Sequence, residues 1–407
     1  MFKRIILKNW KSFRHAVLPL DPLTVVIGIN SSGKSNAVEA LEFLRLITLS
    51  NEIKTDLISS SSTIRGGVNG IAFKPETRFT IETLIEADRE SSVDFLYTIS
   101  LEIEPNFKNI QIYHESLIMT IDGEKKIFFE TLPANSESLE IKALVRDYLS
   151  GSEETEKLLS RQQSILSQVK TSAINIQMNF VFQKLRNIFI FNPEPSKMRN
   201  YSARSDTLQS DGSNIAGVLA DLPDSQKTDV ENTLLKYIQH LPEKDIKKVW
   251  GEVVGRLGKD AMLYCTEEWQ PGKTTEIDAT TMSDGTLRFI AIITALLTRP
   301  EKSQIVIEDV DNGLHPSRIK LLLRMLKEIG EQREIDILVT THNPALLDAL
   351  EPEMMPFVIV AYRDPETGES KLTPLEEIVN FPKLYASNSI GEMVTKGAVE
   401  RSLSRKS

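Results

Sequence analysis

A glycine-rich segment near the N-terminus has the residue types and spacing needed to hold phosphate groups. Gly28-Ile29-Asn30-Ser31-Ser32-Gly33-Lys34-Ser35 fits the pattern G-x-x-x-x-G-K-[ST]. Glycines at both ends let backbone N–H groups turn inward around phosphate oxygens, and a helix that begins there adds the partial positive charge of its N-terminus. Lys34 would reach the β and γ phosphates, and Ser35 could ligate Mg²⁺. The alternative is a Gly/Ser turn that matches the pattern by chance.

Two adjacent carboxylates end an apolar run in the C-terminal half. Residues 304–307 have the short, β-branched character of a buried strand, and Glu308 and Asp309 follow it. Ligands of α/β proteins bind at the carboxyl ends of parallel strands, where these side chains would lie. Since adjacent strand residues point to opposite sides, we expect one carboxylate to face Mg²⁺ and the other an attacking water. The alternative is an acidic strand end that is simply solvated.

Two short polar turns precede predicted helices. In the segment 282–288, either Ser283 or Asp284 would cap the following helix by accepting hydrogen bonds from its free N–H groups. In the segment 340–344, Asn343 suits the N-cap and Pro344 the first helical turn, which leaves His342 at the tip of a strand. Taken alone, the first turn is explained by capping, and His342 has either a structural or a functional role.

The elements that position these residues follow from hydrophobic periodicity. Strands are predicted at 2–9 and 23–27 and a helix with one buried face at 35–47, so the glycine segment lies between a strand and a helix. An antiparallel meander is predicted from β-type runs at 78–86, 93–104, 110–119 and 126–130. Residues 138–185 are rich in Glu, Leu, Lys, Gln and Ser without Pro, and this composition predicts projecting helices.

The rest of the chain has an α/β rhythm. Residues 192–217 combine Pro, Gly and many polar residues and are predicted to form a linker. Predicted helices at 285–297 and 317–330 alternate with predicted strands at 304–307 and 335–340. Short apolar strands that alternate with helices indicate a parallel sheet covered on both faces.

Composition excludes several classes of protein. The 407 residues include 48 Lys and Arg against 57 Asp and Glu, a formal net charge of −9, and 41% are apolar, which is typical of globular chains. The longest apolar stretch, within 289–299, is shorter than the ~18 residues of a membrane span, and the N-terminus lacks the apolar core of a secretory signal. With Cys265 as the single cysteine, a cysteine-rich zinc site is excluded, and we expect a cytoplasmic protein without membrane association.

The order and spacing of these motifs resemble the ABC-type ATPase head of RecF-like, SMC-like and OLD-like proteins. The likeness is strongest to the "AAA family" ATPases of the OLD-like branch, many of which belong to bacterial anti-phage defence systems. In this resemblance, 28–35 is Walker A, 304–309 is Walker B and 312–316 (N-G-L-H-P) is the D-loop. The segments that also match are 5–13, 208–214 and 389–392.

The resemblance implies an α/β fold, a P-loop NTPase of the ABC-ATPase head type. Its mostly parallel sheet would be flanked by helices and joined to an antiparallel β-subdomain and a helical insertion. The implied division is an N-terminal lobe at 1–131, a helical insertion at 132–200 and a C-terminal lobe at 201–407. Such heads are head-to-tail dimers with two ATP molecules in the interface.

The resemblance also assigns residues, with ATP and Mg²⁺ as the cofactors. Ser283, Asp284 and Gly285 would form the signature motif, which contacts the γ-phosphate of ATP held by the opposite subunit. The predicted ATP-binding residues are Gly28, Asn30, Ser31, Ser32, Gly33, Lys34, Ser35, Asn36, Ser283, Asp284 and Gly285. The predicted metal ligands are Ser35 and Glu308, and the predicted catalytic residues are Glu308, Asp309 and the switch histidine His342.

One departure from the family pattern bears on activity. Many ABC heads end Walker B in Asp-Glu, whereas this chain has Glu308-Asp309, so the catalytic position holds a side chain that is one methylene shorter. We therefore expect ATP hydrolysis to be slow or dependent on a partner. The glutamine of the usual Q-loop is not assigned.

The favoured interpretation is an ATP-driven switch of an anti-phage defence system, a dimer or higher homo-oligomer that controls a separately encoded protein effector. The alternatives are a RecF-like recombination or repair ATPase that binds DNA, and an ATP-binding scaffold that does not hydrolyse. The basic segment 244–248 is interpreted as a solvated helix face rather than a DNA contact. A transporter ATPase fits the opening at 5–13 less well, and only 65 residues follow His342, too few for the ~100-residue nuclease domain of OLD proteins.

Overall fold

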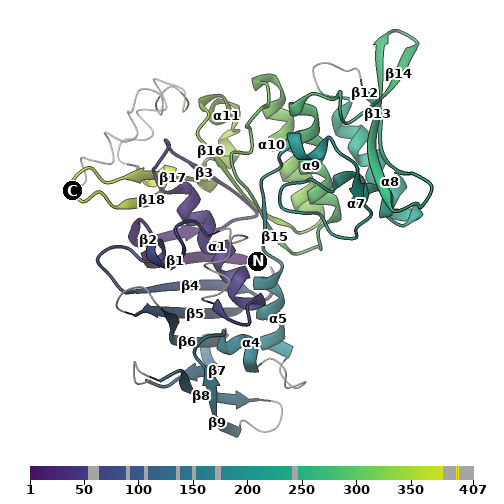
Figure 1. Cartoon of the computed structure of the whole chain (residues 1–407). Coiled ribbons are helices and arrows are strands. Elements are labelled where there is room, and N and C mark those ends of the chain that lie inside the picture. The colour runs from purple at the N-terminus through teal and green to yellow at the C-terminus, as the bar shows by residue number, and fades with distance from the viewer. Residues whose placement is uncertain are drawn as a thin grey trace. The chain divides into compact units, whose positions relative to one another are not determined.

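The computed structural model describes residues 1–378 except 54–63, 89–91, 105–108, 134–137, 149–152, 170–175 and 241–245, and in addition residues 391 and 393. The described residues form two compact units (Figure 1). The first unit comes from Met1–Ile188 and Phe357–Val379, and the second contains Phe189–Pro356. Of the segments that carry the family resemblance, 389–392 lies outside the described residues except for Gly391.

An antiparallel sheet of eight strands dominates the first unit (Figure 1). The strands, in spatial order, are β2 (Phe13–Pro19), β1 (Phe2–Trp10), β4 (Arg78–Glu86), β5 (Val93–Ile103), β6 (Ile110–Ile121), β7 (Glu124–Thr131), β8 (Glu140–Asp147) and β9 (Glu153–Ser160). The predicted meander over 78–130 is confirmed. Strand β2 was not predicted, and it forms a hairpin with β1 through Trp10 and Phe13.

The prediction of helices over 138–185 is wrong for its first half. Strands β8 and β9 occupy this part, and the helices α4 (Ile165–Val169) and α5 (Ile176–Arg186) follow them. In β8 the buried apolar residues are Ile141, Ala143 and Val145, which alternate with a period of two. The composition of this segment favours helix, but its short alternation lets β8 pair with β7 and add an apolar face to the sheet. This pairing outweighs the helix preference.

The remaining strands of the first unit hold the glycine segment. Strand β3 (Leu23–Ile27) is buried throughout and runs parallel to β17 (Val358–Arg363), which pairs antiparallel with β18 (Ser370–Pro374). Helix α1 (Lys34–Leu49) begins at the end of the glycine segment, one residue before the predicted start, and short α3 (Gly67–Ile71) and the 3₁₀ helix η3 (Leu375–Glu377) also belong to the unit.

Aromatic packing joins α1 to the antiparallel sheet. The ring centroids of Trp10 and Phe43 and those of Trp10 and Phe79 are both 5.3 Å apart, and those of Phe43 and Phe79 are 5.6 Å apart. All three side chains are buried. Since tilted and edge-on aromatic contacts stabilise a core beyond its buried area, they hold α1 against the sheet.

The second unit contains a parallel three-stranded arrangement of β10 (Phe189–Phe191), β15 (Gln304–Ile307) and β16 (Asp336–Thr341). Its main helices are α9 (Asp284–Thr298), which is buried over most of its length, and the amphipathic α10 (Pro316–Gln332). Short α11 (Pro344–Ala349) and the 3₁₀ helix η2 (Pro352–Phe357) follow β16. The predicted strand and helix alternation over 285–340 is confirmed.

A small antiparallel sheet in the second unit was not predicted. It consists of β11 (Ser202–Ala203), β12 (Ile246–Val254), β13 (Asp260–Gln270) and β14 (Lys273–Asp278), and α7 (Ile215–Asp221) and α8 (Asp224–Ile238) contact it. Lys247 and Lys248 therefore lie in a strand, and the helix-face interpretation of 244–248 is wrong at these two positions. Val249 and Gly251 are buried and alternate with the more exposed Trp250 and Glu252, and this period of two selects the strand.

The predicted linker at 192–217 is more structured than its composition indicates. It contains α6 (Pro195–Met198), β11 and the start of α7. Asn214 closes the loop before α7, because its side-chain oxygen accepts from the Gln209 N–H at 2.9 Å and its amide donates to the Thr207 carbonyl at 2.9 Å. Side-chain hydrogen bonds to the backbone replace the missing regular structure here.

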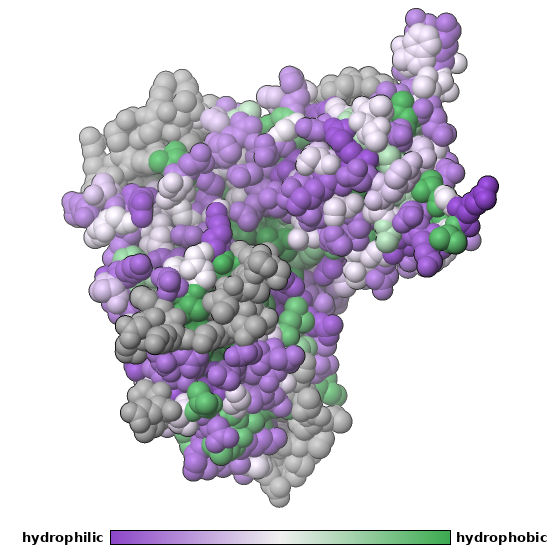
Figure 2. All heavy atoms as spheres, in the orientation of Figure 1, coloured by the Kyte–Doolittle hydropathy of each residue, from purple (hydrophilic) through white to green (hydrophobic). Residues whose placement is uncertain are grey.

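The face drawn in Figure 2 is mainly hydrophilic, with hydrophobic residues in small groups. Among the described helices, none is both long enough and apolar enough to cross a membrane.

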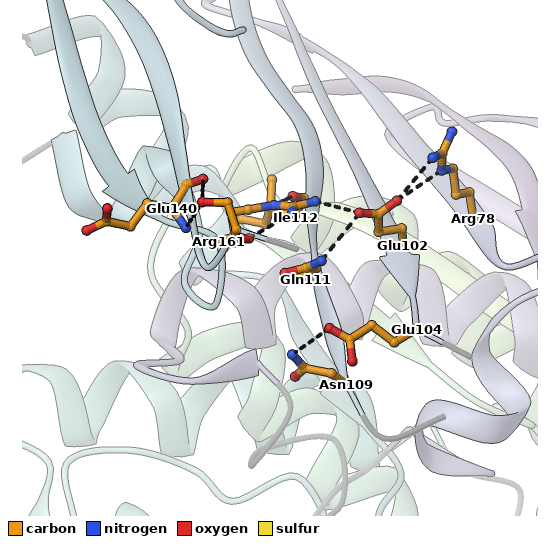
Figure 3. A network of polar contacts seen from close by, with 9 residues as sticks. Arg78, Glu102, Glu104, Asn109, Gln111, Ile112, Glu140 and Arg161 are labelled. Atoms are coloured by element: carbon orange, nitrogen blue, oxygen red, sulfur yellow. Dashed lines mark hydrogen bonds and ion pairs between the residues drawn. The ribbon is translucent and has the colours of Figure 1, made fainter. Parts of the chain in front are cut away.

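A buried arginine cross-links the antiparallel sheet. Arg161 Nη2 donates to Glu102 Oε1 at 2.6 Å, and its Nε donates to the Ile112 carbonyl at 2.7 Å. Gln111 also donates to Glu102 Oε1, at 3.3 Å, and Arg78 binds the other oxygen (Figure 3). Both charges are buried and paired, which is the condition under which burial is tolerated.

Replacing Arg161 by Met should lower the free energy of unfolding by about 3 kcal/mol, because the buried Glu102 carboxylate and the Ile112 carbonyl each lose a donor. Lys142→Met is the matched control, since Lys142 and Glu156 form an exposed ion pair and removing it should change stability by less than about 1 kcal/mol. Urea unfolding followed by circular dichroism measures both variants. Equal effects of the two substitutions would contradict the role assigned to Arg161.

Candidate phosphate-binding loop and carboxylate site

The glycine segment forms a loop that has no room for side chains at its two ends. A Cβ on Gly28 would lie 2.2 Å from the Ala361 carbonyl oxygen of β17. A Cβ on Gly33, which has φ 111°, would lie 2.6 Å from Ser370 Oγ of β18. Glycine is therefore required at both positions by packing against strands that are far away in the sequence.

The N-terminus of α1 is open to an anion. Gly33 caps the helix without a side-chain hydrogen bond, and the first turn holds no acidic residue. Lys34 Nζ donates to the carbonyls of Gly28 at 2.6 Å and Ile29 at 3.1 Å, so its ammonium lies over the loop. Free N–H groups, the helix dipole and a lysine in one place are the requirements for binding phosphate.

The other residues predicted to bind ATP in this loop differ in their surroundings. Asn30 and Ser31 are exposed, and Ser35 is half-buried. Asn36 donates to Ser12 Oγ at 2.7 Å, so its side chain is engaged by the turn after β1. The hydroxyl of Ser32 is buried and, among the described residues, has no hydrogen-bond partner. These residues fit a phosphate group, because the loop offers donors that its own chain leaves unused.

Glu308 and Asp309 lie in a turn directly after β15. Strand β15 ends at Ile307, and Asp309 adopts the left-handed conformation with φ 43°. The strand alternation invoked to separate the two carboxylates therefore does not extend to Asp309. The Asp309 N–H donates to Thr340 Oγ1 at 2.9 Å, which ties this turn to the end of β16.

His342 and Asp309, which follow the neighbouring strands β16 and β15, are brought together. His342 Nδ1 lies 3.2 Å from Asp309 Oδ1. About half of each side chain is exposed, so both groups remain accessible to a ligand. Asn343 accepts from the Ala345 N–H at 2.9 Å and caps α11, which confirms that the cap is Asn343 and leaves His342 at the strand tip.

A buried arginine that the sequence analysis missed supports the carboxylate turn. Arg288 Nη2 donates to the carbonyls of Glu308 at 3.0 Å and Asp309 at 2.9 Å, and its Nη1 donates to the Pro193 carbonyl at 2.8 Å. Burial lowers the pKa of Arg288, while the carboxylates of Asp309 and Asp311 oppose the shift. The available signal was a lone charge at the start of the apolar run 289–297.

The turn before α9 lies against the segment that resembles the D-loop. Ser283 caps the helix, since its Oγ accepts from the Thr286 N–H at 3.1 Å, and the capping explanation is therefore correct for this residue. A Cβ on Gly285 would lie 2.9 Å from both the Gly313 carbonyl oxygen and Arg318 Nη1. The Asp284 side chain is exposed and pairs with Arg199.

The predicted site residues thus form two groups. Residues 28–36 lie together in the first unit, whereas Ser283, Asp284, Gly285, Glu308, Asp309 and His342 lie in the second. Among the described residues, no three His, Cys, Asp or Glu side chains gather as metal ligands. Mg²⁺ needs no such cluster beside a nucleotide, because one or two protein groups and the phosphates hold it.

The comparison with protein families decides the kind of protein. The family described as "AAA domain, putative AbiEii toxin, Type IV TA system" matches residues 23–348. The chain belongs to this family. This membership confirms the fold class predicted from the sequence, an α/β P-loop ATPase domain.

Solved structures similar to this ATPase domain are SMC heads. The SMC head domain from Thermotoga maritima is 14% identical, with a TM-score of 0.45, 92% of this chain covered and 98% of that chain. An SMC head bound to the C-terminal winged-helix domain of ScpA is 14% identical, with a TM-score of 0.49 and coverage of 91% and 96%. An SMC head bound to the C-terminal domain of ScpA from Pyrococcus furiosus is 12% identical, with a TM-score of 0.45 and coverage of 95% and 99%. No curated protein matches the chain.

The left-handed backbone at Asp309 gives a prediction on stability. Asp309→Gly should unfold with a free energy about 1 kcal/mol higher than Asp309→Ala, because glycine adopts this conformation without a Cβ clash. The same pair of substitutions at Lys320, an exposed position inside α10, should give the opposite sign, since alanine is the better helix former by about 1 kcal/mol. Urea unfolding of the four variants measures both differences. An Asp309→Gly variant less stable than Asp309→Ala would contradict the strain.

Proposed function

We propose that this protein is an ATP-binding and ATP-hydrolysing switch. The observation that carries the proposal is the loop at Gly28–Ser35, with its two obligatory glycines, an uncapped helix N-terminus and Lys34 over the loop. Family membership supports it. The experiment that tests it measures ATP binding and phosphate release by the purified chain.

The reaction is transfer of the γ-phosphoryl group of ATP to water. Lys34 and the N–H groups at the start of α1 bind the phosphates. Ser35 and Glu308 are the residues that would hold Mg²⁺, which would neutralise charge on the phosphate oxygens. Asp309 accepts the proton of the attacking water, whose oxygen forms the new bond to phosphorus as the bond to ADP breaks. His342 orients Asp309 through the contact between Nδ1 and Oδ1.

We propose that basal turnover is slow. The carboxylate of Asp309 is one methylene shorter than a glutamate and is already engaged by His342 at 3.2 Å. General bases act within hydrogen-bond reach of the proton they take, so a partner that improves this reach would accelerate hydrolysis. An ATP-binding scaffold without turnover is the limiting case of the same geometry.

The switch operates through assembly. Ser283, Asp284 and Gly285 form the exposed turn at the N-terminus of α9, where the helix dipole attracts an anion once the Asp284 carboxylate is paired. We propose that this turn binds the γ-phosphate of an ATP held by a second copy of the chain, so that ATP closes a head-to-tail dimer and hydrolysis opens it. ATP would then shift the population between two assembly states.

The biological role proposed is control of a separately encoded effector in a bacterial anti-phage defence system. The family description names a putative toxin of a type IV toxin–antitoxin system, which favours a system of more than one component. A RecF-like role in DNA recombination or repair is the alternative. ATP-dependent binding of DNA, measured without an effector, would favour that alternative.

Lys34→Ala should weaken ATP binding by about 30- to 150-fold, because a charge-assisted hydrogen bond to phosphate contributes about 2 to 3 kcal/mol. Titration calorimetry with Mg-ATP measures the affinity. Lys8→Ala is the control, since Lys8 pairs with Glu82 on the antiparallel sheet and should leave ATP affinity unchanged. Equal affinities of Lys34→Ala and the unmutated protein for Mg-ATP would contradict the proposed phosphate site.

Asp309→Ala should retain ATP binding and accumulate the closed dimer, with phosphate release reduced by about 100-fold or more, because the general base is lost. Native mass spectrometry and a phosphate-release assay measure the two effects. Asp229→Ala, an exposed substitution on α8, serves as the control for surface charge. If Asp309→Ala hydrolyses ATP as fast as the unmutated protein, the assignment of the base is wrong.

A further inference from the structure

The turn at the start of α9 carries a negative charge at the place proposed to receive a phosphate. Asp284 is the first residue of the helix, directly after the cap Ser283, and 69% of its side chain is exposed. A carboxylate at this position occupies the positive end of the helix dipole and repels a second anion. The turn therefore needs a compensating cation to bind the γ-phosphate.

Arg199 provides this cation from a distant part of the second unit. It follows α6 directly, and its Nη2 donates to Asp284 Oδ1. Its Nη1 donates to the carbonyls of Ala279 at 3.0 Å, Thr280 at 3.0 Å and Met282 at 2.6 Å. Four acceptors therefore fix the position of the guanidinium, and only 27% of the Arg199 side chain is exposed.

We propose that Arg199 neutralises Asp284 and thereby makes the turn Ser283–Gly285 able to bind the phosphate of ATP. When Arg199 pairs with Asp284, their two charges cancel, and the partial positive charge of the α9 N-terminus is the charge that remains at the turn. Without Arg199, the carboxylate outweighs the partial charge of the helix end, which is about half an elementary charge. Arg199 is thus a positioning and charge-balancing residue, and this inference rests on the proposed ATP-dependent dimer.

Arg199 also has a structural role, which the experiment must distinguish from the compensation of charge. Because Arg199 also binds three carbonyls, it orders residues 279–282 ahead of the cap. Loss of this ordering would persist when Asp284 is neutral, whereas loss of charge compensation would not. A pair of single variants and their double variant distinguishes the two.

The experiment compares the unmutated protein, Arg199→Met, Asp284→Asn and the double variant. Dimer formation is titrated with Mg²⁺ and the β,γ-imido analogue of ATP and followed by light scattering after size-exclusion chromatography. Arg199→Met should raise the analogue concentration for half-maximal dimer by roughly tenfold or more, within the usual range of coupling between sites. Asp284→Asn should leave it unchanged or lower it, and the double variant should return to within about threefold of Asp284→Asn.

Two controls accompany the titration. Arg204→Met removes an arginine that pairs with Asp221 on the surface of the same unit and should change nothing. Binding of a fluorescent ATP analogue to the dilute protein should be equal in all variants, because Lys34 and its loop are untouched.

A double variant as defective as Arg199→Met would overturn the inference, since Arg199 would then act through the carbonyls alone. Normal assembly of Arg199→Met would overturn it as well. If the unmutated protein binds the analogue but does not assemble, the proposed dimer switch fails and the inference fails with it. If the unmutated protein assembles but the double variant is as defective as Arg199→Met, the proposed dimer switch stands and only the role assigned to Arg199 is contradicted.

Discussion

The need to leave backbone N–H groups unused at a phosphate loop constrains much of the first unit. A loop with free donors has to be held from outside, and here strands β17 and β18, more than 300 residues further along the chain, close on Gly28 and Gly33. Their contact distances exclude any side chain at these glycines. The aromatic cluster around Trp10 fixes α1 from the other side, so the helix N-terminus stays in place without a side-chain cap.

The second unit solves a related problem for carboxylates. In the proposed mechanism the side chains of Glu308 and Asp309 serve a metal ion and water, so other groups have to hold their turn. Arg288 and Thr340 hold it through backbone atoms instead, and the positive φ of Asp309 is maintained by these contacts. Strain at a reactive residue persists where its surroundings fix it. Because Arg288 belongs to α9, the helix that Ser283 caps is joined directly to the carboxylate turn.

Local patterns predict the elements and motifs well, and long-range contacts account for what they miss. The glycine loop between strand and helix, the buried strand before Glu308 and the cap at Asn343 each depend on neighbours in sequence, and all were predictable. Strands β8 and β9 were missed because pairing in the sheet outweighs a helix-favouring composition. Arg199 and Arg288 were missed because their partners are mainly backbone carbonyls, which any residue supplies, at separations of up to 95 positions. Sequence patterns record side-chain types, so contacts of this kind leave no pattern in them.

The central claim is that ATP binding is coupled to assembly and slow hydrolysis. The most direct test is the native mass of the purified protein together with phosphate release, measured with and without Mg-ATP. The account predicts a shift from monomer to dimer on addition of Mg-ATP, accompanied by slow release of phosphate. An unchanged mass with no bound nucleotide would contradict it, because the loop Gly28–Ser35 would then not bind the ligand for which its geometry is suited.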